Sequence, residues 1–69
     1  MKESVGRVTE LTARSTKSFE AAIQLALTRA NKTLRNITSA WVKEQRVEVQ
    51  GGKITGYQVN LLVTFVLDD

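Results

Sequence analysis

The sequence predicts an α+β domain in which one helix covers one face of a three-stranded antiparallel sheet. Two observations support this prediction. In residues 16–36, apolar side chains recur every three or four positions, which is the spacing of an amphipathic helix. Two β-rich runs then flank Gly51 and Gly52, a pair that favours a two-residue hairpin turn because glycine accepts positive φ without steric cost. The expected order is strand, helix, strand, turn, strand, in a single domain of residues 1–69.

Residues 5–12 are rich in β-branched side chains and are expected to form the first strand. Ser15 is a candidate N-cap for the helix, with Thr16 and Ser18 as alternatives, because a hydroxyl can accept from the free N–H groups of the first turn. The helix is predicted over residues 16–36, with Asn36 as its terminator. Its apolar stripe is rich in alanine and consists of Phe19, Ala22, Ile23, Ala26, Leu27, Ala30 and Leu34.

The last run alternates, which places Val59, Leu61 and Val63 together on the core side of a strand. With a turn at Gly51 and Gly52, the predicted pairs are Gln50–Lys53, Val42–Leu61, Trp41–Leu62, Ala40–Val63 and Ser39–Thr64. The same count gives the pairs Glu48–Thr55, Arg46–Tyr57 and Gln45–Gln58. It leaves Glu44 and Arg46 on the core side, and two charges there indicate a β-bulge. Trp41, Gln58 and Leu62 are therefore expected on the sheet face that the helix leaves uncovered.

Composition excludes several kinds of chemistry. The chain has no Cys and no His, which removes disulfides, thiolate and imidazole metal ligands, and every nucleophile that depends on a histidine base. The carboxylates form no spaced pair, and Asp68 and Asp69 are expected to be a solvated tail. We therefore expect neither an enzyme nor a metal site.

The formal net charge of +3 does not indicate a nucleic-acid partner, because the cations are scattered among acids. The one cluster, Arg29, Lys32 and Arg35, lies where the predicted helix ends, and cations there offset the helix dipole. No apolar run is long enough for a membrane span, and no targeting signal is recognisable. We expect a cytoplasmic protein without a membrane or nucleic-acid partner.

A domain of this size buries only about 60% of its unfolded surface, so it usually needs disulfides, a metal or oligomerisation. Only oligomerisation remains here. The uncovered face also offers binding chemistry: the indole of Trp41 is either an interface residue or a platform for a flat ring. The Gln58 amide can either bind the edge of a flavin or a base, or bond to Gln45 across the strands.

Several segments together resemble the dodecin family, whose members are small flavin-binding proteins that assemble as hollow dodecamers. The segments are residues 7–11, Ser15, and residues 19–23, 30–36, 57–59 and 63–67. The resemblance covers nearly the whole chain. It implies a β-α-β-β subunit with the helix on one face, and burial of the free faces by self-assembly into a homo-oligomer, a dodecamer in this family.

In flavin-binding dodecins, a Trp at the start of the second strand stacks on the isoalloxazine ring and a Gln in the last strand contacts it. Gln58 falls on that Gln, whereas Ser39 falls on the Trp position and Trp41 lies two residues later, about 6.6 Å along the strand. Arg46 resembles a basic residue that can meet a flavin or nucleotide tail.

The resemblance therefore implies a protein that binds and stores riboflavin, FMN or FAD without turning it over. The expected contacts are Trp41 and Gln58, with Ser39 and Arg46 in addition. The alternative is a dodecin-fold shell that has lost flavin binding, has Trp41 in a subunit interface, and is structural or binds another small ligand or a cation.

Overall fold

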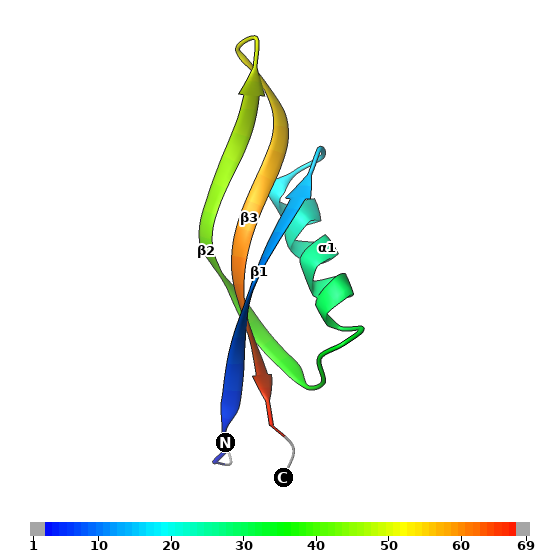
Figure 1. Cartoon of the computed structure of the whole chain (residues 1–69), viewed down its shortest axis with the longest axis vertical. Helices are drawn as coiled ribbons and strands as arrows, with labels where there is room; N and C mark the ends of the chain where they lie inside the picture. The colour runs from blue at the N-terminus through cyan, green and yellow to red at the C-terminus, as the bar shows by residue number, and fades with distance from the viewer. Residues whose placement is uncertain (1–2, 68–69) are drawn as a thin grey trace.

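The computed structural model describes residues 3–67 and shows one antiparallel sheet with one helix against one of its faces (Figure 1). The elements are β1 (Gly6–Ser15), α1 (Phe19–Ala30), β2 (Ile37–Gln50) and β3 (Lys53–Val66). The strand order in the sheet is β1-β3-β2, and β3 pairs antiparallel with both neighbours. The predicted α+β class and β-α-β-β order are confirmed.

The helix begins later than predicted because the first strand is longer. β1 continues to pair with β3 as far as Ser15, which faces Tyr57, so the chain can turn only after that residue. Ser18 is the N-cap, and its Oγ accepts a hydrogen bond of 3.0 Å from the N–H of Ala21. The preference for Ser15 as N-cap was wrong, and the alternative Ser18 is correct. Ser15 Oγ instead accepts from the N–H of Lys17 in the connecting turn.

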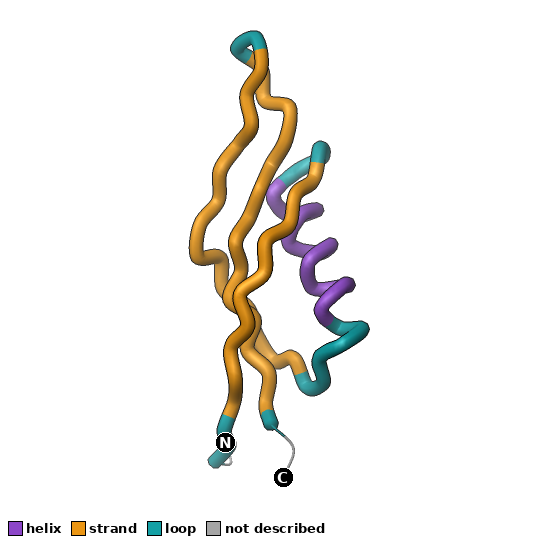
Figure 2. Tube along the Cα trace, viewed as in Figure 1, coloured by secondary structure: helices purple, strands orange, loops and turns teal. Residues whose placement is uncertain are grey.

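The helix also ends earlier than predicted, at Ala30 with Asn31 as C-cap. The N–H groups of Thr33 and Leu34 both donate to the carbonyl of Ala30, which tightens the chain into a turn. Figure 2 shows the loop that then leads back to the sheet. Asn36 does not terminate the helix: it takes a positive φ of 62° immediately before β2 begins, a conformation that asparagine tolerates better than most residues.

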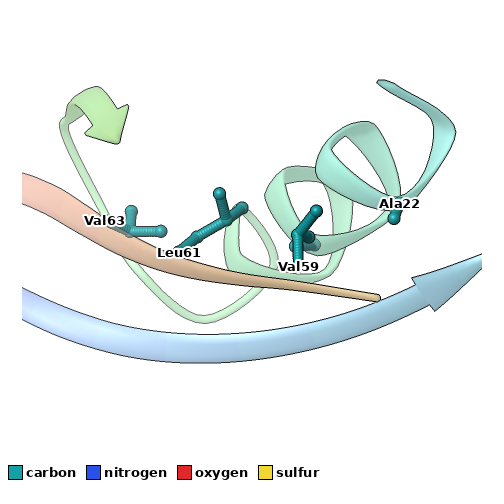
Figure 3. Close-up of a cluster of buried hydrophobic side chains, with 5 residues drawn as sticks. Ala22, Val59, Leu61 and Val63 are labelled. Atoms are coloured by element: carbon teal, nitrogen blue, oxygen red, sulfur yellow. The ribbon is translucent and has the colours of Figure 1, made fainter. Parts of the chain in front are cut away.

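The core lies between α1 and the central strand. Val59, Leu61 and Val63 project from β3 toward the helix and are fully buried (Figure 3). They pack on Ala22 and Ala26 of α1. Because alanine has a short side chain, the helix lies close on the sheet, as its alanine-rich stripe predicts. The opposite face of the sheet has no covering element among residues 3–67.

The hairpin turn is confirmed, since Gly51 and Gly52 have φ values of 59° and 78°. The predicted pairs that are also confirmed are Gln50–Lys53, Val42–Leu61, Trp41–Leu62, Ala40–Val63 and Ser39–Thr64. The pairs Glu48–Thr55, Arg46–Tyr57 and Gln45–Gln58 were wrong. Thr55 is an extra residue on β3, and its hydroxyl donates a hydrogen bond to the carbonyl of Glu48. Lys43 is an extra residue on β2, and it brings the residue pairs beyond it back to those predicted from the turn.

Of the three register shifts between β2 and β3, those at Lys43 and Thr55 decide which charges share a face. Between them, Glu44 faces Asn60, Gln45 faces Val59 and Arg46 faces Gln58. Glu44 and Arg46 therefore leave the core side, where the simple count placed them, and join the uncovered face. The β-bulge that these two charges indicated is confirmed.

The chain is elongated, with extents of 52 × 20 × 16 Å, because the β2–β3 hairpin extends past the helix (Figure 1). Within the described part of the chain, no helix is both long enough and apolar enough to cross a membrane. At the end of the hairpin, Val49 and Ile54 form a pair near the turn and are both exposed. The single chain thus leaves the apolar side chains of Val49 and Ile54 in contact with water at the hairpin end.

Candidate functional site

The candidate site is the uncovered face, defined as the sheet surface opposite α1. The register arranges its middle part in three rows across β2, β3 and β1. The rows are Trp41–Leu62–Glu10, Glu44–Asn60–Thr12 and Arg46–Gln58–Arg14. The first row is largely apolar on the β2 side and the other two are polar, so one face offers two kinds of surface side by side.

Trp41 provides the apolar part of this face. Its side chain lies beside Leu62 and remains 51% exposed, although indole is among the largest apolar groups in proteins. The strand below it is held by ladder hydrogen bonds to β3, so the ring is presented by a rigid support. A flat aromatic ligand or the surface of another subunit would remove this apolar area from water.

A shallow pocket of about 130 Å³ occupies the polar rows. Its lining consists of Glu44, Arg46, Gln58 and Asn60 of this face, together with Gln45, which lies between Glu44 and Arg46 on β2. Within residues 3–67, the Gln58 amide and the Arg46 guanidinium make no side-chain hydrogen bond. The hydroxyl of Thr12 donates to Oδ1 of Asn60 at 3.4 Å, which directs the Asn60 amide nitrogen away from β1. The pocket thus combines free donors and acceptors, as the edge of a heterocycle requires.

Two ion pairs cross the central strand on this face, one at each end of the pocket. Nζ of Lys43 lies 3.4 Å from Oε1 of Glu10, on the side toward Trp41. Toward the hairpin turn, Nη2 and Nε of Arg14 each lie 2.7 Å from Oε1 of Glu48. Gly56 makes room for the second pair, because a Cβ at this position would lie 2.5 Å from Oε1 of Glu48.

The structure places the four residues predicted to bind a ligand on the same face but not at the same point. Arg46 and Gln58 are direct cross-strand neighbours, and Ser39 and Trp41 lie further along β2. Trp41 faces Leu62, four residues from Gln58, which is about 13 Å along the strand. The predicted alternative of a bond between Gln45 and Gln58 is wrong, because the two residues lie on opposite faces.

Asn60 and Lys43 were missed by the sequence-based selection of site residues. The alternation of β3 already placed Asn60 beside Gln58, but Lys43 could be placed only once the bulge was located. Among residues 3–67, no three acidic side chains gather as a metal site would require. Asp68 and Asp69 lie outside the described residues.

Comparison with known proteins identifies the family. Residues 5–68 match the family model "Dodecin". The chain belongs to the dodecin family. The dodecin of Thermus thermophilus is 45% identical over 60 residues, which are 87% of each chain. A crystal structure of a Thermus thermophilus protein superposes with a TM-score of 0.90 at 42% identity and covers 97% of this chain and 98% of its own.

A further similar structure is that of a dodecin with a calcium-binding site. The calcium dodecin of Mycobacterium tuberculosis, described as a calcium-chelating antigen, has a TM-score of 0.79 and 35% identity. It covers 94% of this chain and 93% of its own. Family membership therefore confirms the fold that the resemblance implied, whereas the ligand must be argued from the uncovered face of this chain.

Proposed function

We propose that this dodecin binds and stores a flavin, either riboflavin, FMN or FAD, without catalysis, between copies of itself in a cytoplasmic homododecamer. One observation carries the proposal: the half-exposed indole of Trp41 and the Gln58 amide, which has no partner in the described chain, share the uncovered face. The isoalloxazine ring matches this pairing, because it joins a flat apolar surface to a polar pyrimidine edge.

The polar pocket supplies the contacts for the ligand's edge. The Gln58 amide both donates and accepts, which suits the alternating carbonyl and N–H groups of a flavin pyrimidine. Arg46 adjoins it and contributes a positive charge with several donors. Ser39 lies beyond Trp41 on the same face, where its hydroxyl can contact a ring stacked on the indole.

One subunit does not enclose a flavin. Ligand sites usually measure about 300–1,000 Å³, and the pocket here is about 130 Å³. A second copy of the uncovered face, packed against the first, would close the site and also bury the apolar surface that a small domain cannot cover. In this proposal the contact between the two copies completes the site, and the oligomer itself forms with or without flavin.

The site is also suited to holding a ligand rather than converting it. The chain has no His and no Cys, so the commonest general base and the thiol nucleophile are both missing. A flavin stacked on an indole can lose its excited state through the contact, which agrees with storage or photoprotection.

Titration of FMN with the purified protein tests the proposal. We expect flavin fluorescence to be quenched at micromolar protein, with an endpoint that reports the number of sites per subunit. The variant Gln58→Leu, similar in size but without the amide, is expected to bind about ten-fold more weakly, since a hydrogen bond contributes ~1 kcal/mol or somewhat more. Unchanged FMN emission with the unmodified protein would refute the proposal.

The alternative is a shell without flavin, in which Trp41 packs against another subunit. The observation that favours it is the separation of about 13 Å between the rows of Trp41 and Gln58. Another small ligand or a cation would then take the place of the flavin. Comparing assembly and flavin binding in a Trp41 variant separates the two functions.

A further inference from the structure

Lys43 lies on the uncovered face between the apolar part around Trp41 and the polar pocket. It is the extra residue at the β2 bulge, between Trp41, which faces Leu62, and Glu44, which faces Asn60. Its side chain crosses the central strand to reach Glu10 on β1, with 3.4 Å between Nζ and Oε1. The Lys43–Glu10 pair therefore separates the apolar platform from the polar pocket, and a ligand that uses both must lie over it.

The Lys43–Glu10 ion pair is weak enough for Lys43 to change its anionic partner. Its side chains are 50% and 43% exposed, and the separation of 3.4 Å is longer than that of a strong charge-assisted hydrogen bond. Exposed pairs of this kind contribute little to stability because water and salt screen them. The second cross-strand pair differs: Arg14 holds Glu48 at 2.7 Å over Gly56, and its Nε and Nη2 both reach the same carboxylate oxygen.

A bound ligand changes the strength of the Lys43–Glu10 interaction. It would shield the Lys43–Glu10 pair from water, and any change that leaves the ammonium group without an anion then costs free energy. A neutral ligand offers no replacement for the carboxylate, whereas a phosphate does. The charges that face this region are Glu10 and Glu44, which repel an anion, and Lys43 and Arg46, which attract it.

We propose that Lys43 exchanges Glu10 for the phosphate of the bound ligand, which makes the site selective for phosphorylated flavins over riboflavin. This inference rests on the flavin-binding function proposed above. It assigns different roles to the two bases: Arg46 belongs to the pocket in every state, whereas Lys43 changes partner when the ligand enters. Glu10 is then a competitor of the phosphate.

The test compares the dissociation constants of FMN and riboflavin in the unmodified protein and in four variants. We expect FMN to bind about five-fold more tightly than riboflavin, the upper range for one exposed charge pair. Lys43→Met should remove the preference by weakening FMN alone, and Lys43→Arg should retain it. Glu10→Gln should strengthen FMN about two-fold by removing the competitor. Lys53→Met, which deletes the same charge beside the hairpin turn, is the matched control.

The outcomes distinguish the two proposals. Equal affinities for FMN and riboflavin in the unmodified protein, or a preference that survives in Lys43→Met, would overturn the role of Lys43 and leave flavin binding in place. A Lys53→Met variant that loses the preference equally would assign the effect to net charge and also overturn it. Failure of both flavins to bind the unmodified protein would overturn the proposed function together with this inference. Size-exclusion chromatography checks that each variant assembles as the unmodified protein does.

Discussion

Replacing Leu61 with Ala is expected to lower the free energy of unfolding by about 3 kcal/mol, the middle of the range for a buried leucine. Leu61 is 1% exposed and is the largest fully buried side chain among residues 3–67. It lies on the central strand between Val59 and Val63 and faces the alanine stripe of α1. Because alanines cannot move in to fill the space, the cavity should persist and the full penalty should apply.

Chemical denaturation at a fixed protein concentration measures this loss, since the stability of the proposed homo-oligomer would depend on concentration. Leu25→Ala is the matched control: it deletes the same atoms from a helix position that is 55% exposed in the subunit. It should cost well under ~1 kcal/mol. Equal losses in the two variants would contradict a core built between β3 and the helix.

Replacing Trp41 with Ala is expected to weaken FMN binding about 30-fold. The estimate follows from stacking of a base on an aromatic side chain, which is worth ~1–3 kcal/mol by alanine substitution, with 1.4 kcal/mol per ten-fold change. The indole is half-exposed in the subunit and makes no contribution to the buried core, so the fold should survive. Fluorescence titration with FMN gives the affinity, and light scattering gives the oligomer size.

Trp41→Phe is the control for this variant, because it keeps an aromatic ring and should recover a large part of the affinity. Loss of the oligomer in Trp41→Ala, with or without FMN, would instead place the indole in a subunit interface and favour the empty shell. An intact oligomer with unchanged FMN affinity would exclude Trp41 from the flavin contact.

The elements with a strong periodic signal could be predicted well from the sequence. The alanine-rich stripe located the helix, and the alternation in β3 identified Val59, Leu61 and Val63 as core. The helix ends were wrong for a physical reason: pairing with β3 keeps the chain extended to Ser15, and Ala30 already accepts the bonds that close the last turn. Local capping preferences could not reveal either constraint.

The site depended on register, which is not a local property. The face shared by Trp41, Leu62 and Gln58 was predicted correctly because alternation along β3 places Leu62 and Gln58 together, and because the extra residues Thr55 and Lys43 cancel before Trp41 is reached. Arg46 was paired with Tyr57 because a count from the turn does not locate the extra residues Thr55 and Lys43. The charges of Glu44 and Arg46 did indicate the irregularity, since neither tolerates the core side.

Size-exclusion chromatography of the purified protein after incubation with FMN shows whether this dodecin is a flavin store built from copies of itself. Protein absorbance and the visible flavin band should be recorded together. We expect the flavin band to elute with a dodecamer of the 7.7 kDa subunit and the flavin emission to be quenched. A dodecamer that elutes colourless, with all FMN retained as free ligand, would contradict the proposed flavin storage.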